Sequence, residues 1–572
     1  MKLRLPRFFS ALCVLCVSSQ VFALDREAFT FTKYDLQVRI DPAQQRLGAR
    51  GTVTLRNDSA TPQRIAVLQI SSSLSWRSIQ LGGKRVQFVA QPFTSDIDHT
   101  GALSEAVVSL PQAVVPKSSV DLEIAYEGVI VPDATRLTRI GTPESFANSA
   151  DWDQISAAFT AVRGAGNVAW YPIATEVADL SEGQDLQQVS LRWRQREADA
   201  AMHIQLSVTA DQSPESEKPE LLVNASNCSS SAEAGGQFVA DCSYHSAGAN
   251  APTFVMANYA SIDRAAIAVH FLPGHDNAAA IYADAAEKAL PLITEWFGTP
   301  HGKAQAADLP DASALPYESG PLLLTPLTGT DAKVAGLAAA HQLTHAAFFS
   351  PRPWINEGLA HFAQALFLER ESGRQAALAY LATHRPSPAE TAAPHADHET
   401  HDSLINTADE QLYRSKAMSV WWMLRDLVGD AALKKAIAAY HPDDDKEPSY
   451  MQHLTQAQTQ RDLEWFFDDW VYRDRGLPDF KVKSAFVRKT LPAGYLLTVT
   501  VQNLGGAGAE VPLVVKYEGG ELMKRLEVHG KSEAVIRVET PKPPDEIVVN
   551  DGSVPESDVT NNVFKIETSS TP

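Results

Sequence analysis

The sequence predicts a multidomain chain with an N-terminal antiparallel β-domain, a mainly α-helical middle domain and a C-terminal β-sandwich. Three observations support this fold class. Apolar and polar residues alternate from residue 29 to about 260, which is typical of half-buried strands. A helical period begins at Asp276, and alternation with Gly-rich turns returns near Pro478. The expected regions are a leader at 1–23 and domains at 24–262, 263–476 and 477–572.

Length and charge limit the classes of function. The chain has 572 residues, of which 44% are apolar and 21% are charged, so it can form several packed cores. Asp and Glu number 69 against 49 Lys and Arg, which gives a formal net charge of −20. No basic run stands out that could follow a phosphate backbone. We therefore expect no nucleic-acid partner.

The first 23 residues have the pattern of a secretory signal peptide. Lys2, Arg4 and Arg7 precede an apolar run over Phe8–Val17, and small residues follow at Val21-Phe22-Ala23. A membrane anchor is the alternative, but this run is shorter than the ~20 residues that a spanning helix needs. We expect an exported protein, periplasmic or extracellular, with no transmembrane segment after cleavage.

Two cysteines, Cys228 and Cys242, remain after the leader and flank a stretch rich in Ser, Ala and Gly. In an exported chain this spacing predicts a disulfide that closes a hairpin loop and contributes about 3 kcal/mol of stability. A redox or metal role would favour a CxxC spacing, which Cys228 and Cys242 do not have.

The elements of each region follow from their periodicity. Residues 34–40 and 120–124 alternate strictly and are predicted as strands of the first region. The predicted helices of the middle region are Asn277 to Phe297, Lys333 to Phe349, Pro353 to Glu369, Gln411 to Val428 and Asp462 to Tyr472. The predicted strands of the sandwich include 496–501, 511–515 and 534–538.

A candidate metal site lies on the second and third of these helices. His341 and His345 are four residues apart, so they share one helical face and can chelate one ion. Spacing alone is a weak signal, because two histidines on a helix are more often packed or solvated. His395, His398 and His401 lie in a stretch rich in Ala, Pro and Asp, which favours a solvated loop over a second metal site.

Glu357 strengthens the prediction through geometry. His345 lies about one turn before the first helix ends, and Glu357 lies about one turn inside the next helix. If the two helices pack antiparallel, these side chains face each other at the same height. His341, His345 and Glu357 would then hold one zinc ion per chain with a fourth position open to water, the arrangement of catalytic zinc.

At these residues the sequence resembles the membrane alanyl aminopeptidase (aminopeptidase N) family of gluzincin zinc metallopeptidases. The segment Trp354–Ala360 matches the family stretch W-[LI]-N-E-G-[FL]-A. The segment Tyr413–Met418 resembles the family's Y-x-x-x-A-M, and Leu463–Trp470 resembles its closing helix. The resemblance implies a thermolysin-like catalytic domain, peptide substrates, and a role for Tyr413 in steadying the tetrahedral intermediate.

Two departures affect the ligand spacing and the substrate anchor. Eleven residues separate His345 from Glu357, whereas the family pattern has about 18. The exopeptidase strand, G-x-M-E-N in the family, is replaced by Leu315–Gly320. By resemblance Glu318 would bind the free amino group of a substrate, and an exposed carboxylate at a strand edge is the alternative.

A third departure concerns the general base. The family's HExxH motif uses its Glu to accept a proton from zinc-bound water, but position 342 is Gln here. A carboxamide can hydrogen-bond to that water and cannot take its proton. General-base catalysis contributes about 10² to 10⁴ in rate, so if only the base is missing, Gln342→Glu is expected to raise hydrolysis by about 10² or more. If wild type already hydrolyses peptides well and this change adds little, Glu318 or His361, one turn after Glu357, is the first candidate for the base.

Two functions from different classes remain open at this stage. The first is an exported zinc metallopeptidase of the aminopeptidase N type that acts on peptides, with catalysis impaired at Gln342. The second is a catalytically silent zinc-containing homologue that binds peptides or a protein partner. The ligands and Tyr413 favour the first function, and Gln342 favours the second.

Overall fold

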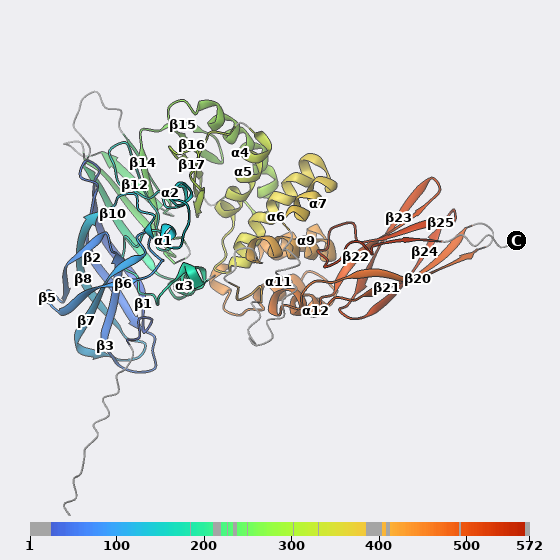
Figure 1. The fold of residues 1–572 in the computed structure, drawn as a ribbon, viewed down its shortest axis with the longest axis horizontal. Coiled ribbons are helices and arrows are strands. Elements are labelled where there is room, and N and C mark those ends of the chain that lie inside the picture. The colour runs from blue at the N-terminus through green and yellow to red at the C-terminus, as the bar shows by residue number, and fades with distance from the viewer. Residues whose placement is uncertain are drawn as a thin grey trace, which may run out of the picture.

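The computed structural model is elongated, with sheets at both ends and helices between them (Figure 1). It describes residues 24–182, 185–209, 219–225, 227–232, 237–248, 250–300, 302–329, 331–384, 403–407, 412–490 and 494–566. The expected signal peptide at 1–23 lies outside the described residues, as do His395, His398 and His401. Of the helices that the structure describes, none is both long and apolar enough to cross a membrane.

The N-terminal region is built on an eight-stranded sheet with two three-stranded sheets beside it. In spatial order the large sheet contains β12 (Asn227–Ala232), β13 (Gln237–Tyr244), β10 (Ala201–Thr209), β1 (Phe29–Asp41), β2 (Arg46–Asn57), β8 (Ser119–Val129), β4 (Leu74–Leu81) and β5 (Lys84–Arg85). The small sheets are β3 (Gln63–Ser71), β7 (Ala102–Val114) and β6 (Gln87–Thr94), and β11 (Glu220–Val223), β14 (Phe254–Ala257) and β9 (Phe159–Val162). Short helices are α1 (Thr135–Thr138), α2 (Glu144–Ala150) and η1 (Leu180–Glu182).

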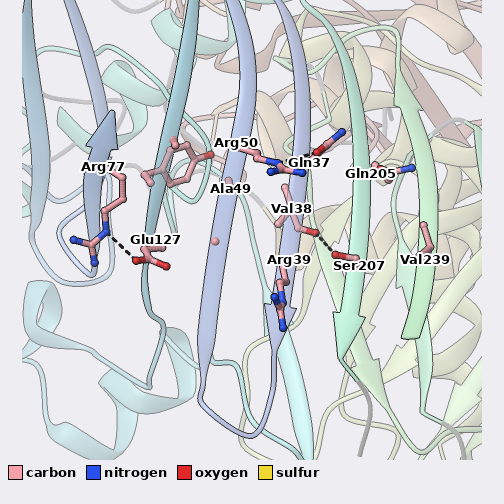
Figure 2. Close-up of a pocket in the computed structure, with 13 residues that line it drawn as sticks. Gln37, Val38, Arg39, Ala49, Arg50, Arg77, Glu127, Gln205, Ser207 and Val239 are labelled. Atoms are coloured by element: carbon pink, nitrogen blue, oxygen red, sulfur yellow. Dashed lines mark hydrogen bonds and ion pairs between the residues drawn. The ribbon is translucent and has the colours of Figure 1, made fainter. Parts of the chain in front are cut away.

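Alternation along the large sheet separates a buried face from a polar face. Val38 is buried, whereas its neighbours Gln37 and Arg39 lie on the outer face, where a concavity of about 610 Å³ opens (Figure 2). On this face Arg77 donates to Glu127 at 2.9 Å. The alternating pattern that predicted the strands is thus explained by one packed face and one solvated face.

Two features of this region differ from the expectation of a purely antiparallel β-domain. β1 pairs with β10 in parallel, so the large sheet is mixed. A helix of 12 residues, α3 (Asp185–Arg196), follows η1 and buries Val189 and Trp193. Strand alternation is the same for parallel and antiparallel pairs, which explains why the sequence pattern does not reveal the pairing.

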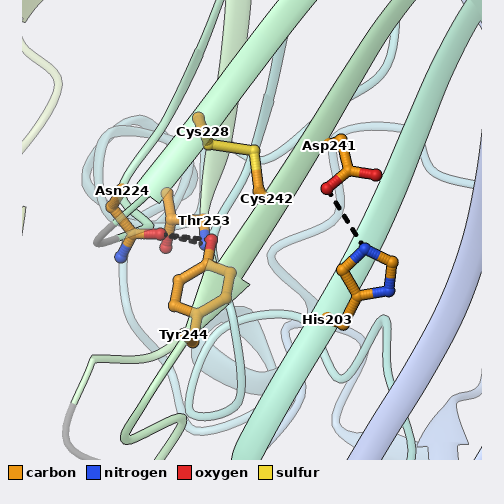
Figure 3. The surroundings of a disulfide bond; sticks show 7 residues. All are labelled: His203, Asn224, Cys228, Asp241, Cys242, Tyr244 and Thr253. Carbon is orange, nitrogen blue, oxygen red and sulfur yellow. Dashed lines mark hydrogen bonds and ion pairs between the residues drawn. A yellow bond between two sulfur atoms is a disulfide. The ribbon is translucent and has the colours of Figure 1, made fainter.

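Cys228 and Cys242 form a disulfide between the adjacent strands β12 and β13 (Figure 3). The two residues are directly opposite each other in the antiparallel register, with Cα atoms 4.2 Å apart. Close to it, the Tyr244 hydroxyl donates to Oδ1 of Asn224 at 2.8 Å.

The middle region combines helices with a five-stranded mixed sheet that the sequence analysis did not predict as a sheet. In spatial order its strands are β15 (Ala260–Asp263), β16 (Ile267–Phe271), β17 (Ala304–Asp308), β19 (Leu322–Thr325) and β18 (Tyr317–Ser319). The helices are α4 (Asp276–Phe297), α5 (Ala332–Ala347), α6 (Pro353–Ser372), α7 (Arg374–Thr383), α9 (Ala417–Val428), α10 (Asp430–Ala438), α11 (Tyr450–Gln456) and α12 (Glu464–Phe467). Two π-helical segments, η2 (Leu412–Lys416) and η4 (Asp468–Tyr472), and a 3₁₀ turn, η3 (Pro442–Asp444), complete it. The strands are only three to five residues long, which makes their alternation too short to detect.

The C-terminal region contains two antiparallel sheets. One contains β20 (Phe480–Lys489), β21 (Tyr495–Asn503) and β24 (Glu533–Thr540), and the other contains β23 (Gly520–Val528), β22 (Ala509–Tyr517), β25 (Pro544–Val549) and β26 (Val563–Lys565). Their inner residues, such as Val499 and Leu513, belong to one hydrophobic core with the helices of the middle region. Trp470 adds a hydrogen bond from its indole to the Gly508 carbonyl at 2.7 Å. The N-terminal region has a separate core.

Candidate metal centre

Helices α5 and α6 form the antiparallel hairpin that the sequence predicts. Asp331 caps α5 by accepting from the backbone N–H groups of Lys333 and Val334, and Pro353 is the first residue of α6. Gln364 of α6 donates to the Leu337 carbonyl near the start of α5 at 3.1 Å. Near the end of α5, Nε2 of His345 lies 3.5 Å from Oε1 of Glu357, which is near the start of α6. The two contacts run in opposite directions along the helices, so the helices are antiparallel.

Four side chains converge near the end of this hairpin where the turn joins α5 to α6. Nε2 of His341 lies 3.2 Å from Nε2 of His345, 3.7 Å from Oε2 of Glu357 and 3.5 Å from Oε2 of Glu318 on β18. Ligands bound to zinc at 2.0–2.1 Å in a tetrahedron are about 3.3 Å apart. The side chains are therefore spaced as a zinc site requires.

The start of α6 is held by tight packing against α9. The rings of Trp354 and Trp421 stack with centroids 5.1 Å apart, and the Trp421 indole donates to the Trp354 carbonyl at 3.2 Å. A Cβ at Gly358 would lie 2.7 Å from the Cβ of Ala417, so this position requires glycine for the close approach of the helices. These contacts fix the turn of α6 that carries Glu357.

The π-helical segment η2 brings two further side chains to the site. Tyr413 lines a cavity of about 370 Å³ next to His341 and Glu357. Nε of Arg414 lies 3.6 Å from Oε2 of Glu357, so the guanidinium partly balances this carboxylate. π-Helical turns within helical segments are frequent at functional sites.

The site lies in a cleft between the N-terminal and middle regions. Glu318, Asn356 and Glu357 line both the 370 Å³ cavity and an adjoining cavity of about 560 Å³. Arg194 of α3 also lines both cavities, and α3 lies on the side of the N-terminal region that faces the helices (Figure 1). The combined space is large enough for several residues of a peptide.

Burial dominates the electrostatics of the site. It lowers the pKa of His341 well below its usual value, lowers that of His345, and lowers that of His361 to about 4. Neutral imidazole is the form that binds metals. Burial, helped by the charge of Glu357, raises the pKa of Glu318 well above its usual value. Burial also opposes ionisation of Glu357, but His345 and Arg414 outweigh it and leave the pKa of Glu357 lowered.

Several buried polar atoms at the site have no hydrogen-bond partner among the residues that the structure describes. They are Oε1 of Glu318, Nδ1 of His341, Oε2 of Glu357 and Nε2 of His361. Buried polar atoms in folded proteins are normally paired, so such a concentration needs a specific cause. A divalent cation would satisfy carboxylate oxygens and imidazole nitrogens at once, and this donor set suits zinc. The residues present therefore fit a zinc ion.

Gln342 does not face this cluster, contrary to what its place in the motif predicts. Its side chain is fully buried and lines neither cavity. Its Nε2 donates to the Gln305 carbonyl at 2.6 Å, and its Oε1 accepts from the Tyr282 hydroxyl at 2.8 Å. The amide thus links α5 to α4 and β17 as a structural group, because all its bonds are made inside the protein.

Arg414 and Arg194 were not expected at the site from the sequence, and His361 was expected there only as a substitute for the missing base. A signal for His361 was available, because it lies four residues after Glu357 and must share its helical face. Atoms of His341, Glu357 and His361 lie within 4.8 Å of one another, as do those of Glu318, His341 and His345. Arg194 could not be predicted, because it comes from the N-terminal region.

Comparisons with known proteins show similarity at the level of the fold. No protein-family model and no curated protein matches the sequence. The chain is similar to a glutamate-to-alanine mutant of an M1 zinc metallopeptidase from Deinococcus radiodurans bound to a Tyr-Ser-Ala substrate, with a TM-score of 0.50, 17% identity, and coverage of 79% of this chain and 96% of that one. The same mutant in another structure gives a TM-score of 0.47 with 16% identity over 79% and 96% of the two chains, and the M1 zinc metallopeptidase gives 0.45 with 16% over 75% and 90%. The multidomain fold is thus similar to that of M1 zinc metallopeptidases.

Proposed function

We propose that this chain is an exported zinc metallopeptidase of the aminopeptidase N type that binds peptides and hydrolyses them with impaired efficiency. In this proposal a thermolysin-like domain at 263–476 lies between the N-terminal β-domain and the C-terminal sandwich. The observation that carries the proposal is the convergence of His341, His345, Glu357 and Glu318 with zinc-like spacing at a peptide-sized cleft. The similarity of the fold to M1 zinc metallopeptidases supports it.

Each residue has a role that follows from its position. Bound zinc would polarise a peptide carbonyl and acidify a water molecule. Tyr413 lines the same cavity as Glu357, so its hydroxyl can donate to the oxyanion that forms. Glu318 can hold a protonated amino terminus, because a buried carboxylate gains from a cationic partner. Gln342 accepts no proton, and its amide is engaged elsewhere.

A catalytically silent, zinc-containing protein that binds peptides or a protein partner is the second candidate. The specific observation in its favour is the orientation of Gln342, whose Nε2 lies 2.6 Å from one backbone carbonyl and 3.4 Å from another, that of Pro321. Such a side chain neither holds nor moves the proton of a hydrolytic water. The share of about 10² to 10⁴ in rate that a general base supplies is then absent.

Binding and turnover measured together distinguish the two candidates. Purified protein is loaded with zinc, and short peptides with free or acetylated amino termini are tested for binding and hydrolysis. We expect one zinc per chain, tighter binding of the free peptides, and slow hydrolysis. Glu318→Gln should remove the preference for a free amino terminus while zinc content stays the same.

Each result has a definite consequence. Peptide binding with no hydrolysis would select the silent protein. Wild-type protein that takes up no zinc would refute both candidates. Equal binding of free and acetylated peptides would remove Glu318 from its assigned role. Export is tested separately, by whether the mature protein recovered outside the cytoplasm begins near Leu24.

A further inference from the structure

Strand β18 carries Glu318 and lies at the edge of the five-stranded sheet. In that sheet its neighbour is β19, which pairs with it through Tyr317, Glu318 and Ser319. A strand this short is weakly held by its ladder alone. The position of Glu318 therefore depends on what else holds β18.

The Glu318 carboxylate itself is not anchored by hydrogen bonds to the residues that the structure describes. Its Oε1 is a buried atom without a partner, and its Oε2 lies 3.5 Å from Nε2 of His341. Side chains alternate along a strand, so Glu318 points to the opposite face of β18 from Tyr317 and Ser319. Contacts on the Tyr317 and Ser319 face therefore decide where the carboxylate lies.

Asn224 of the N-terminal region contacts β18 on that face. Its side chain is buried, and its Nδ2 donates to Oγ of Ser319 at 2.8 Å and to the Ala251 carbonyl at 2.9 Å. Its Oδ1 accepts from the Tyr244 hydroxyl at 2.8 Å and from the backbone N–H of Thr253 at 2.9 Å (Figure 3). An amide side chain has two N–H donors and an oxygen that accepts twice, so every hydrogen bond of Asn224 is made. Its orientation is therefore fixed.

Other contacts to the N-terminal region hold the segment that leads into β18. The backbone N–H of Leu315 donates to the Ser149 carbonyl at 2.8 Å, and the Trp152 indole donates to the Leu315 carbonyl at 3.0 Å. These bonds lie before the strand, whereas Asn224 binds the strand residue that follows Glu318. The Asn224–Ser319 bond therefore acts on the part of β18 that carries the carboxylate.

We propose that Asn224 is a positioning residue for the peptide site. Through Ser319 it holds β18 against the N-terminal region, so that Glu318 meets the amino terminus of a bound peptide. This inference rests on the proposed function for the role of Glu318. A misplacement of about 1 Å at a site can cost about 10² in rate, so loss of this one bond should be measurable in substrate recognition.

The preference for a free amino terminus tests this role. It is measured by calorimetry on zinc-loaded protein, as the ratio of the Kd of acetylated trialanine to the Kd of trialanine. We expect Asn224→Ala to lower this ratio about tenfold or more, as Glu318→Gln does, while zinc content stays the same.

Asn57→Ala is the matched control. Asn57 is another buried asparagine of the N-terminal region, and its Nδ2 donates to the carbonyls of Thr61 and Val114, both at 2.8 Å. Like Asn224, it lines neither cavity of the cleft. Both variants should lower the free energy of unfolding, because each leaves a carbonyl without its donor. Only Asn224→Ala should change the ratio.

Ser319→Ala covers the case in which Asn224→Ala does not fold. It removes the hydroxyl that Asn224 binds, so it should also lower the ratio. Added to Asn224→Ala it should have little further effect on the ratio, because the two side chains act through one bond.

The outcomes separate this inference from the proposed function. If folded Asn224→Ala or Ser319→Ala keeps the wild-type ratio while Glu318→Gln loses it, the inference is overturned and the proposed function stands. An equal fall of the ratio in Asn57→Ala would also overturn the inference, since any loosening of the N-terminal region would then suffice. If Glu318→Gln itself keeps the ratio, the assigned role of Glu318 fails, and the inference fails with it.

Discussion

Two buried polar clusters of this protein satisfy their charges in different ways. In the N-terminal region Arg136 pairs with Asp151 and Arg163 pairs with Asp153, and both carboxylates are fully buried. Arg136 also donates to the Gly166 carbonyl at 2.7 Å. None of these four described side chains has a buried polar atom without a partner.

The cluster at the cleft has the reverse character. Within the described part of the chain, Glu318, His341, Glu357 and His361 each leave a buried polar atom without a hydrogen bond. The four side chains of the first cluster are paired with protein groups, as in a structural cluster. The second cluster would be paired only with a bound cation, as in a metal site. Both clusters are buried and charged, so the difference between these two sets of side chains lies in the number of their hydrogen-bond partners.

Breaking the complete cluster should produce the largest loss of stability. Asp151→Ala leaves Arg136 buried without its charge partner. Such a change typically lowers the free energy of unfolding by about 3 to 5 kcal/mol. Chemical denaturation of the metal-free protein measures the change. Asp284→Ala, which removes an exposed pair with Arg264, is the matched control and should cost about 1 kcal/mol or less. A similar small loss in both variants would show that the cluster is not structural.

Completing the second cluster should stabilise the protein by a comparable amount. Zinc at 1,000 times its dissociation constant should raise the free energy of unfolding by about 4 kcal/mol, because only the folded state presents the site. Asp151→Ala should keep this increment, and His341→Ala should lose it. Equal stabilisation of wild type and His341→Ala would mean that zinc binds elsewhere.

The sequence predicts one of these clusters better than the other. The 3.6-residue period and the short turn are sufficient to bring His345 opposite Glu357, and the same period places His361 beside them. The pairing of Arg136 with Asp151 depends on loops whose path no local pattern encodes. The orientation of Gln342 depends on Tyr282 and Gln305, which lie 60 and 37 residues away in the chain. Local periodicity therefore predicts which residues meet along a helix hairpin, and it does not predict which way a side chain turns.

Glu197 shows a third way to satisfy a buried carboxyl group, through a proton. Burial is the main cause that raises the pKa of Glu197 to about 7. The protonated carboxyl can donate to the Tyr34 hydroxyl at 2.8 Å, while that hydroxyl donates to the Pro172 carbonyl at 3.0 Å. The ionised form leaves one of these oxygens without a donor.

The pKa of Glu197 predicts a pH-dependent gain from Glu197→Gln. Its folded value lies above the unfolded value of about 4.5, so the folded state holds the proton more tightly and ionisation destabilises it. The loss of folding free energy caused by ionised Glu197 is fully present above pH 7, and it disappears as the pH falls toward 4.5. The amide of Gln is neutral and can donate a hydrogen bond, as the protonated acid does. Relative to wild type, Glu197→Gln should therefore stabilise the protein by about 3 kcal/mol at pH 8 and by almost nothing at pH 4. A gain that does not vary between these pH values would exclude the proton as the partner of Glu197.

Gln342→Glu is the smallest expected effect, and it tests whether position 342 belongs to the structural or to the functional group. A carboxylate there still accepts from Tyr282, but it faces the carbonyls of Gln305 and Pro321 with no hydrogen to offer. We expect a loss of about 1 to 3 kcal/mol at pH 8. The repulsion raises the pKa of the new carboxyl in the folded state, so the loss should shrink as the pH falls and the acid regains a donor.

Gln458→Glu, which adds the same charge at an exposed position, is the control and should change stability by less than about 0.5 kcal/mol. Because the side chain is directed away from the cleft, Gln342→Glu should leave peptide hydrolysis and zinc affinity as they are in wild type. A rise in hydrolysis of about 10² or more would contradict this orientation, since it would require the carboxylate to reach the water beside the metal. Position 342 would then belong with the functional cluster.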